Sequence, residues 1–196
     1  CQSYVERSPS NKKEPEIAHE KAVYPFQRIH MDFCNYAGQQ WLAIGDQFSG
    51  FPLLRRFGKE ALSSDVIKYL KNVFENFGIP ETIYSDGGPQ FISQEFEKMC
   101  KEYRIDHRIS SPHYPQSNGL AEQTVKQMKR LLHCTYNPQI KTVDPDRWMK
   151  AIILFRNTPR SPSGFSPNEL LFGRQLRDIL PADRGHYLPQ HRQAIE

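Results

Sequence analysis

Residues 26–57, FQRIHMDFCNYAGQQWLAIGDQFSGFPLLRRF, decide the fold. This stretch contains three apolar runs, at 26–34, 41–48 and 51–57, with short polar or glycine-containing segments between them. Runs of this length that are rich in aromatic and β-branched residues are typical of strands, and turns this short join antiparallel neighbours. We therefore expect an antiparallel meander of three strands.

Strands and helices alternate after the meander. Residues 63–78 bring a set of apolar side chains onto one helical face, and a glycine and a proline end that helix. Residues 81–86 and 105–110 have the composition of short strands, and 93–104 between them have a helical pattern. This order predicts an α/β fold with a mixed five-stranded sheet flanked by helices. The apolar face of the first helix consists of Val66, Ile67, Leu70, Val73, Phe74 and Phe77.

A loop and two helices follow the fifth strand. Prolines and small polar residues in 111–119 are typical of a loop, which we expect to be mobile. A helix is expected from Asn118, a good N-cap, to about Cys134. Asp144 should cap a second helix that has Pro145 at its first position. The predicted inward faces are Ala121, Val125, Met128 and Leu132 on the first helix, and Trp148, Ile152 and Phe155 on the second.

We expect three segments along the 196 residues. Residues 1–23 are polar, charged and interrupted by prolines, which is typical of a linker or extended arm. Residues 24–160 hold the expected strands and long helices and form the core domain. Residues 161–196 are proline-rich again, apart from a short helical piece at 167–173, and form a C-terminal extension. Because the first residue is Cys1 rather than a methionine, we expect a piece of a longer chain.

Composition sets broad limits on function. No apolar stretch approaches the roughly 18–20 residues of a membrane span, so we expect a soluble core. The four cysteines, at positions 1, 34, 100 and 134, form no C-x-x-C pair, which argues against a disulfide framework and against a complete zinc site. Reduced thiols in an intracellular protein are the simplest interpretation. A net charge of +4 permits nucleic-acid binding without indicating it.

Three acidic residues occupy unusual positions. Asp32 interrupts an otherwise apolar strand, where a carboxylate is costly unless a cation or hydrogen-bond donors meet it. Asp86 ends the fourth strand, before Gly87 and Gly88, where a carboxylate can project from the sheet edge. Glu122 lies in the first turns of the helix after the loop. Any one of these acids on its own is as readily explained as a helix cap or a surface charge.

Three converging carboxylates would repel one another unless divalent cations neutralised them. Oxygen-only ligands favour Mg²⁺ or Mn²⁺ over zinc. Two such ions about 3.5–4 Å apart can hold the attacking and leaving oxygens of a phosphodiester. Asp86 and Glu122 have 35 residues between them, but in a chain with 22 acidic residues such a spacing also arises by chance.

Several segments resemble one protein family. SDGGPQF (85–91) and SSPHYPQSNGLAEQTVKQMKRLL (110–132) resemble the second and third catalytic blocks of retroviral-type integrases, in particular those of long-terminal-repeat retrotransposons of the gypsy type. IHMDF (29–33) resembles the first block. RNTP (156–159) and LLFGRQLRDILP (170–181) resemble the segment that follows the core.

The resemblance covers about residues 24–181, in the family's order and with its gaps. It implies the ribonuclease-H-like fold and an integrase that trims the ends of element DNA and joins them to target DNA. It also implies that Asp32, Asp86 and Glu122 bind two Mg²⁺ or Mn²⁺ ions and carry out catalysis. Expected partners are DNA and further copies of the chain, with no membrane, and the expected location is the nucleus.

The resemblance also suggests DNA contacts. The loop bearing Tyr114, Gln116 and Ser117 is expected to touch DNA near the active site. Lys126 and Lys129 lie four and seven residues after Glu122, hence on its helix face, where they can reach phosphates. The alternative for both lysines is a solvated basic helix face without a ligand.

The chain departs from the family pattern at two positions near the acids. Gly87 stands where relatives often have asparagine, and Gln123 stands where many have a basic residue, which could weaken substrate positioning. Cys1 resembles the last cysteine of a preceding zinc-binding domain whose other ligands are absent here. Two other functions remain open: a ribonuclease-H-type hydrolase, which usually needs a fourth acid, and a non-catalytic DNA-binding or assembly module from a relic or host-recruited integrase.

Overall fold

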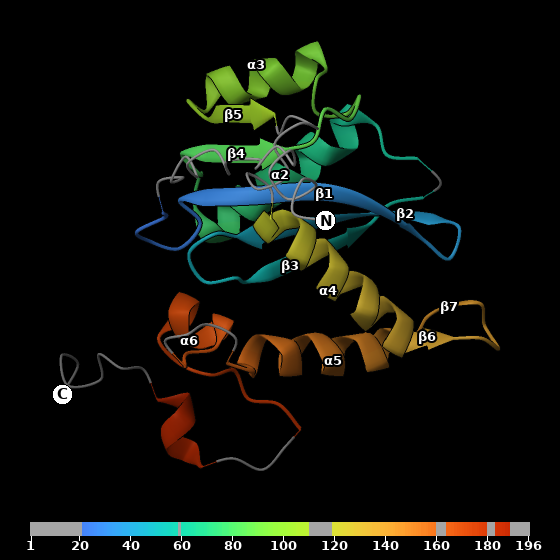
Figure 1. Cartoon of the computed structure of the whole chain (residues 1–196), viewed down its shortest axis with the longest axis vertical. Coiled ribbons are helices and arrows are strands. Elements are labelled where there is room, and N and C mark those ends of the chain that lie inside the picture. Colours follow the sequence, from blue (N-terminus) through green and yellow to red (C-terminus); the bar gives the residue numbers. More distant parts are fainter. Residues whose placement is uncertain (1–20, 59, 110–118, 160–163, 180–182, 189–196) are drawn as a thin grey trace, which may run out of the picture.

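The computed structural model describes residues 21–58, 60–109, 119–159, 164–179 and 183–188 (Figure 1). Its centre is a five-stranded sheet in the order β3-β2-β1-β4-β5. β1 pairs antiparallel with β2, and β2 with β3, whereas β4 pairs parallel with β1 and with β5. The predicted mixed sheet is confirmed. The strands are β1 (Arg28–Tyr36), β2 (Gln39–Asp46), β3 (Pro52–Arg56), β4 (Thr82–Ser85) and β5 (Asp106–Ile109).

A two-residue turn sets the register of the meander. Tyr36 pairs with Gln39, so only Ala37 and Gly38 connect β1 to β2. Both connecting residues have positive φ, 52° and 71°. Such turns match the right-handed twist of the strands, and the register they set sends alternate residues of β1 to opposite faces of the sheet.

One face of the sheet packs against α2 (Ser63–Phe77) and α3 (Gln94–Glu102). Ile29 and Met31 of β1 are fully buried in this layer, together with Ile83 of β4. They belong to the larger of two buried apolar clusters among the described residues. Burial of each large aliphatic side chain stabilises the fold by about 1.5–3 kcal/mol. The larger cluster also contains Leu42, Ile44, Val66, Leu70, Val73, Phe74, Phe91, Phe96 and Met99.

The other face packs against α4 (Gly119–Thr135) and α5 (Pro145–Asn157). Met128 and Leu132 of α4 are fully buried against β1 and β2, as predicted. The predicted cap of α5 is also present, because the Asp144 carboxylate accepts hydrogen bonds from the amides of Asp146 and Arg147 at 3.0 Å each. Pro145 occupies the first position of α5. The second cluster also contains Cys34, Trp41, Ala43, Val143, Ile152 and Phe155.

Asn157, the last residue of α5, connects the helix to the chain that follows. Its side chain donates to the carbonyl of Leu176 at 2.7 Å and to Asp178 Oδ2 at 3.1 Å. Its Oδ1 accepts from Asn168 Nδ2 at 2.7 Å and from the amide of Leu176 at 3.1 Å. Asn168 belongs to α6 (Pro167–Phe172), the predicted short helical piece. One buried amide therefore holds α6 and residues 176–178 to the end of α5.

Two small elements were not predicted. They are the hairpin of β6 (Tyr136–Asn137) with β7 (Thr142–Val143), and the 3₁₀ turn η2 (Arg184–Tyr187). Strands of two residues are too short to show an alternating pattern. The predicted mobile loop, 111–119, lies almost wholly outside the described residues; only Gly119, the first residue of α4, is described.

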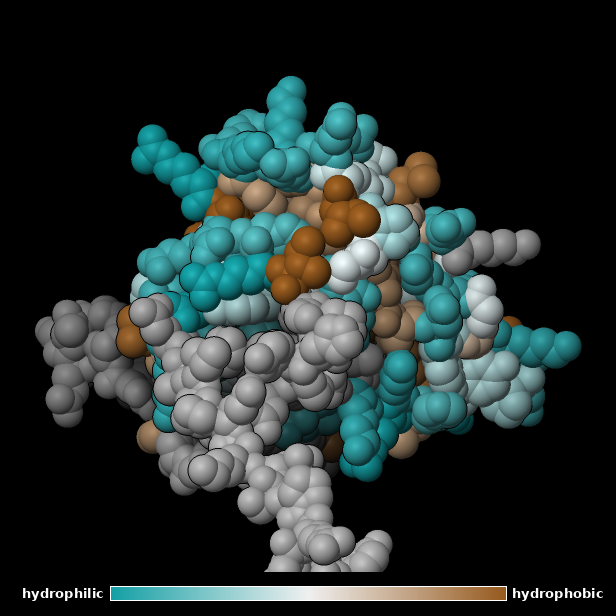
Figure 2. Space-filling model, turned by 45° about the horizontal axis from the view of Figure 1, so that its top comes forward, coloured by the Kyte–Doolittle hydropathy of each residue, from teal (hydrophilic) through white to brown (hydrophobic). Residues whose placement is uncertain are grey.

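The described surface is mixed in character. Figure 2 shows hydrophilic side chains over much of one face, with apolar ones in smaller groups between them. Exposed large apolar residues include Ile79, Ile92 and Ile109. Among the described helices, none combines the length and apolar character that crossing a membrane requires.

Candidate active site

Asp32 and Asp86 follow paired segments of two parallel strands. β1 and β4 run parallel, and His30 pairs with Tyr84. Asp32 and Asp86 each lie two residues beyond this pair, and the same register continued past the end of β4 would make them neighbours on one face of the sheet. The rings of His30 and Tyr84 stack on that face with centroids 4.6 Å apart. Asp86 directly follows the last residue of β4.

The Asp86 carboxylate is held by the turn that follows β4. The amide of Gly88 donates a hydrogen bond to Asp86 Oδ1 at 3.1 Å. A β-carbon at Gly88 would lie 3.0 Å from the same oxygen, whereas one at Gly87 would have no neighbour nearer than 3.8 Å. The lack of a side chain at Gly88 therefore leaves room for the carboxylate in this orientation. Asp86 is half-buried.

The Asp86 backbone is held by Ser85 and His107. Ser85 Oγ donates to the carbonyl of Asp86 at 2.9 Å and lies 2.8 Å from His107 Nε2. Because the serine hydroxyl has one proton, this arrangement is satisfied when Nε2 carries a proton and donates it to Oγ. The His107 ring packs edge-on against Phe96. Burial lowers the pKa of His107, and the nearby Asp106 carboxylate acts in the opposite direction.

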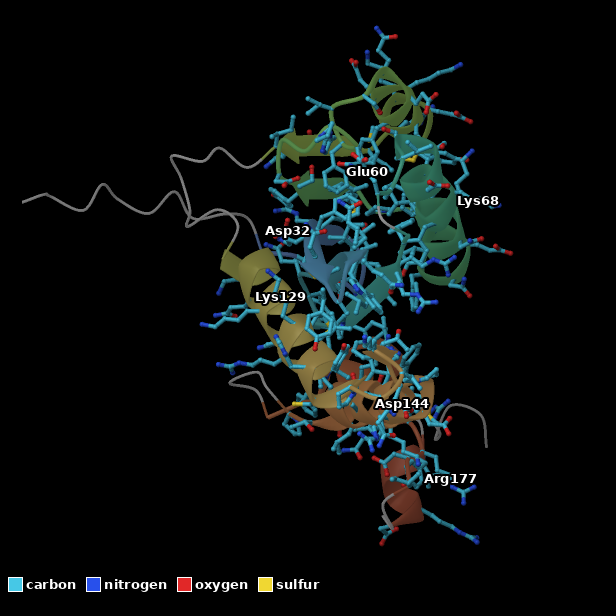
Figure 3. The ribbon with its side chains drawn as sticks, turned by 90° about the vertical axis from the view of Figure 1, so that its right-hand side faces the viewer. Asp32, Glu60, Lys68, Lys129, Asp144 and Arg177 are labelled. Atoms are coloured by element: carbon cyan, nitrogen blue, oxygen red, sulfur yellow. The ribbon has the colours of Figure 1, made fainter. Side chains whose placement is uncertain are left out.

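Asp32 lies on the sheet face that α4 covers, two residues before Cys34. Burial raises the pKa of the Cys34 thiol, the Lys129 ammonium lowers it, and the Asp32 carboxylate raises it. Lys129 and Asp32 are thus both within electrostatic reach of one buried thiol. Figure 3 shows Asp32 on the sheet and Lys129 on the adjacent α4. The Lys129 ammonium and the Asp32 carboxylate therefore lie on the same side of the sheet, near Cys34.

Glu122 is the fourth residue of α4, a helix that contacts β1 and β2. Its backbone belongs to the described chain, but its side chain does not, so the predicted convergence of three carboxylates stays a prediction. Among the side chains that the structure describes, no three histidines, cysteines or acids gather in a metal-binding group. Asp32 and Asp86 are the two described members of the predicted ligand set.

Two of the five predicted DNA contacts are described in the structure, and three are not. Lys126 and Lys129 are exposed on α4, as a phosphate contact requires. Tyr114, Gln116 and Ser117 lie outside the described residues. The DNA-binding assignments of all five residues stay predictions.

A row of side chains beside the acids was not singled out from the sequence. His30, Tyr84 and Arg108 pair in sequence across β1, β4 and β5. The run IDHRIS was identified as a strand, and its alternation could have indicated that Asp106 and Arg108 share a face. What it could not indicate was the register with Tyr84.

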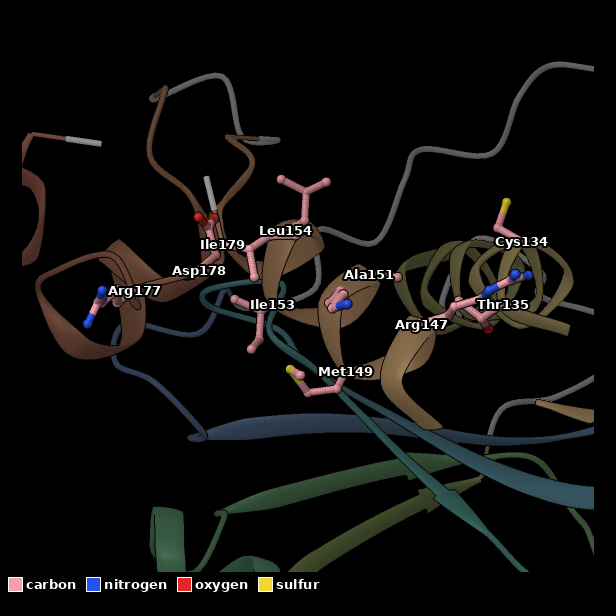
Figure 4. A pocket seen from close by; sticks show the side chains of 11 residues that line it. Cys134, Thr135, Arg147, Met149, Ala151, Ile153, Leu154, Arg177, Asp178 and Ile179 are labelled. Atoms are coloured by element: carbon pink, nitrogen blue, oxygen red, sulfur yellow. The ribbon is translucent and has the colours of Figure 1, made fainter. Parts of the chain in front are cut away.

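A separate cavity of about 750 Å³ lies along α5 (Figure 4). Met149, Leu154 and Ile179 contribute apolar surface, and Arg147 and Arg177 contribute charge. None of the predicted acidic residues lines it, so it is not part of the candidate active site.

Comparison with known proteins identifies the same family. Residues 22–115 match the integrase core domain family. An uncharacterized protein of Caenorhabditis elegans is 34% identical over 175 residues, which are 85% of this chain and 13% of that protein. The Pro-Pol polyprotein of simian foamy virus type 3 is 28% identical over 168 residues, 81% of this chain and 14% of the polyprotein. The chain thus spans about an eighth of the length of these relatives.

Solved structures share the fold. A chain of the simian T-cell lymphotropic virus intasome, in complex with a PP2A regulatory subunit, superposes with a TM-score of 0.69 at 23% identity, covering 84% of this chain and 60% of that one. The HTLV-2 integrase catalytic core domain in complex with magnesium gives 0.60 at 24% identity, covering 76% and 98%. Sequence and fold together make this chain a member of the retroviral-type integrase core family, with the ribonuclease-H-like fold of that family.

Proposed function

We propose that the chain is the catalytic core of a metal-dependent DNA integrase, which processes the 3′ ends of element DNA and transfers them to target DNA. The observation that supports this best is the pairing of β1 with β4. Continued by two residues, this register would make neighbours of Asp32 and Asp86, two half-buried acids from segments far apart in the sequence. Half-buried carboxylates that lie close together repel each other, so such an arrangement fits a site that binds cations.

The donor set fits magnesium or manganese. Carboxylate oxygens are ligands that both ions prefer, and the relative from HTLV-2 was solved in complex with magnesium. In the proposed site Asp32, Asp86 and Glu122 hold two ions. When bound, such ions stabilise the charge that develops on the attacking and leaving oxygens of a phosphodiester.

The protein's own residues keep the acids in position. Asp32 pairs with Ala43 of β2, and β1 also pairs with β4 as far as His30, two residues before Asp32. These pairings hold the backbone on which Asp32 lies. Gly88 orients the Asp86 carboxylate, and Ser85 holds the Asp86 carbonyl. Positions fixed before the substrate arrives reduce the entropy that a transition state must lose. In this proposal Lys126 and Lys129 bind phosphates, and Tyr114, Gln116 and Ser117 contact DNA near the acids.

The wider role belongs to the same proposal. Ends of element DNA and a target duplex are the proposed substrates, several copies of the chain act together, and the reaction takes place in the nucleus. Relatives support the first two points, because one structure is an intasome and the HTLV-2 core was solved in dimeric and trimeric forms.

The test uses the full chain and a branched DNA that mimics the joined product. With Mg²⁺ or Mn²⁺ the chain should resolve this substrate by reversing strand joining. Asp86→Asn and Glu122→Gln should abolish the reaction without unfolding the protein, because each removes a ligand charge at nearly constant volume. Glu97→Gln is the matched control, since Glu97 is an exposed acid on α3 that pairs with Lys101.

Two outcomes would contradict the proposal. Full activity of Glu122→Gln, in a preparation free of other nucleases, would exclude the three-carboxylate mechanism. A wild-type chain that binds DNA and metal but transfers no strand would favour the non-catalytic assembly module instead.

A further inference from the structure

We propose that Arg108 binds a DNA phosphate and so positions the strand beside Asp32 and Asp86. This inference rests on the proposed function, because it assigns a DNA contact to the same site. It concerns a residue of β5, on the side of the acids opposite to α4.

Register places Arg108 one row behind the acids. His30 pairs with Tyr84, and Tyr84 pairs with Arg108, so the three residues form a row across parallel strands. Asp32 and Asp86 form the next row toward the carboxyl ends of the strands. Strands lie about 4.8 Å apart and rise about 3.3 Å per residue, so the Cα atoms of Arg108 and Asp86 are separated by roughly 8 Å. The guanidinium group contacts Tyr84 and Asp106, so a phosphate that it binds would lie beside the acids rather than against them.

The guanidinium group is held in position on one side. Its Cζ lies 5.8 Å from the centroid of the Tyr84 ring, and its Nη1 lies 3.4 Å from the Tyr84 hydroxyl. Arg108 Nε donates to Asp106 Oδ2 at 2.7 Å. Tyr84 is itself buried and stacked on His30 with an interplanar angle of 9°. The arginine therefore rests on a rigid aromatic support, which reduces the side-chain entropy lost on binding.

The group also remains able to bind a ligand. The Arg108 side chain is 52% exposed, and its Nη2 takes part in none of the contacts just described. Guanidinium has five N–H donors in a planar arrangement that matches phosphate oxygens. The Asp106 partner does not prevent this, because an exposed ion pair contributes little in water and its acid can stay bonded to Nε.

The distribution of charge favours DNA as the ligand. Two carboxylates alone would repel a phosphate backbone. Lys126 and Lys129 on α4 supply positive charge on one side of them, and Arg108 on β5 supplies it on the other, as the positions of these elements in Figure 1 indicate. A strand lying across the acids can thus be held at both sides, and most protein–DNA hydrogen bonds go to phosphates.

The experiment compares Arg108→Gln and Arg108→Lys with Arg104→Gln in the full chain. Arg104 is exposed and precedes β5, at the end of the strand away from Asp86. Because Arg104 has a positive φ of 57°, glutamine is chosen to keep an unbranched side chain at this position. Binding of the branched DNA is followed by fluorescence anisotropy over a salt titration. Steady-state rates on the same DNA give KM and kcat, and thermal unfolding checks each variant.

Arg108→Gln should weaken binding about tenfold and reduce the salt slope by about one phosphate contact. KM should rise while kcat stays within about twofold, because the lost contact holds DNA without touching the reacting atoms. Arg108→Lys should be intermediate, since it keeps the charge and loses the planar contact with Tyr84. Arg104→Gln should match the wild type. A folded Arg108→Gln variant with wild-type affinity, salt slope and KM would overturn the inference.

The two proposals can fail separately. If Asp86→Asn is inactive and Arg108→Gln binds like the wild type, the carboxylate mechanism stands and the role of Arg108 is wrong. If the wild type transfers no strand but Arg108→Gln still binds the branched DNA more weakly, the DNA contact stands and the proposed chemistry is wrong.

Discussion

Gly88 shows how one missing side chain leaves room for the Asp86 carboxylate, a proposed metal ligand. Replacing it with alanine puts a β-carbon 3.0 Å from Asp86 Oδ1, so the carboxylate must shift slightly. If Asp86 is a metal ligand as proposed, this shift should lower the rate on branched DNA by up to roughly 10-fold. Thermal unfolding should change little, since the site lies at the surface.

Gly87→Ala provides the comparison for this variant. Its added β-carbon meets nothing nearer than Ile109 Cγ2 at 3.8 Å, so its activity should stay close to that of the wild type. Equal rates for Gly88→Ala and the wild type would mean that the orientation of Asp86 is set by something other than this turn.

His107 should make stability depend on pH. Burial lowers its pKa in the folded state below the ordinary value of 6.5, so the unfolded chain takes up the proton first. The stability contributed by neutral His107 is full above pH 6.5 and is lost as the pH falls through the lowered pKa. Urea unfolding between pH 7.5 and 5 should therefore show a decline for the wild type that is smaller for His107→Phe. If stability fell equally with pH in the wild type and in His107→Phe, then His107 would have the same pKa in the folded and the unfolded chain.

At the level of secondary structure, α6 depends on Asn157. Four hydrogen bonds join this buried amide to Asn168, Leu176 and Asp178. Asn157→Ala leaves buried partners unsatisfied and should lower the free energy of unfolding by about 2–3 kcal/mol. The melting temperature should fall by roughly 4–12 °C. Asn76→Ala on α2, which removes an exposed hydrogen bond to Asn72, should shift it far less.

The sequence predicted the elements well and their side-chain networks poorly. Alternating or periodic apolar residues revealed the five strands and the long helices, because burial of one face imposes that period. RNTP (156–159) was recognised only by resemblance. Its asparagine follows the inward face of α5, but a polar residue there does not reveal which distant carbonyl it will meet. The partners of Asn157 come from a later segment, whose path no local pattern specifies.

On the scale of the whole molecule, DNA affinity should be modest. A net charge of +4 supplies few phosphate contacts, so the full chain should bind duplex DNA weakly, with little preference for sequence. Lys126→Ala should reduce the salt slope by about one contact. Tight binding that persists at high salt would show that other interactions dominate. Lys68→Ala is the control, because Lys68 is an exposed lysine on α2, on the face of the sheet opposite to α4.

The acids of the candidate site could be predicted from the sequence, whereas Arg108 could not. Asp32 and Asp86 stood out by their positions in and directly after predicted strands, and the family resemblance assigned them as metal ligands. The β1–β4 register pairs residues two positions before each of them. Arg108 could not be found in this way, because its relation to Tyr84 arises only when β5 adds to β4. An acid that interrupts an apolar run stands out in the sequence. A basic residue on an exposed edge strand looks like any other surface charge.

From the parallel pairing of β1 with β4 we also expect an order of events in folding. The meander of β1, β2 and β3 needs only local contacts, so it can form while later residues are still being synthesised. Asp32 then sits on a finished strand without its neighbour. The acid pair exists only after α2 has crossed over and β4 has docked, which closes a long loop. A nascent chain would therefore acquire its antiparallel strands before the proposed metal site could form.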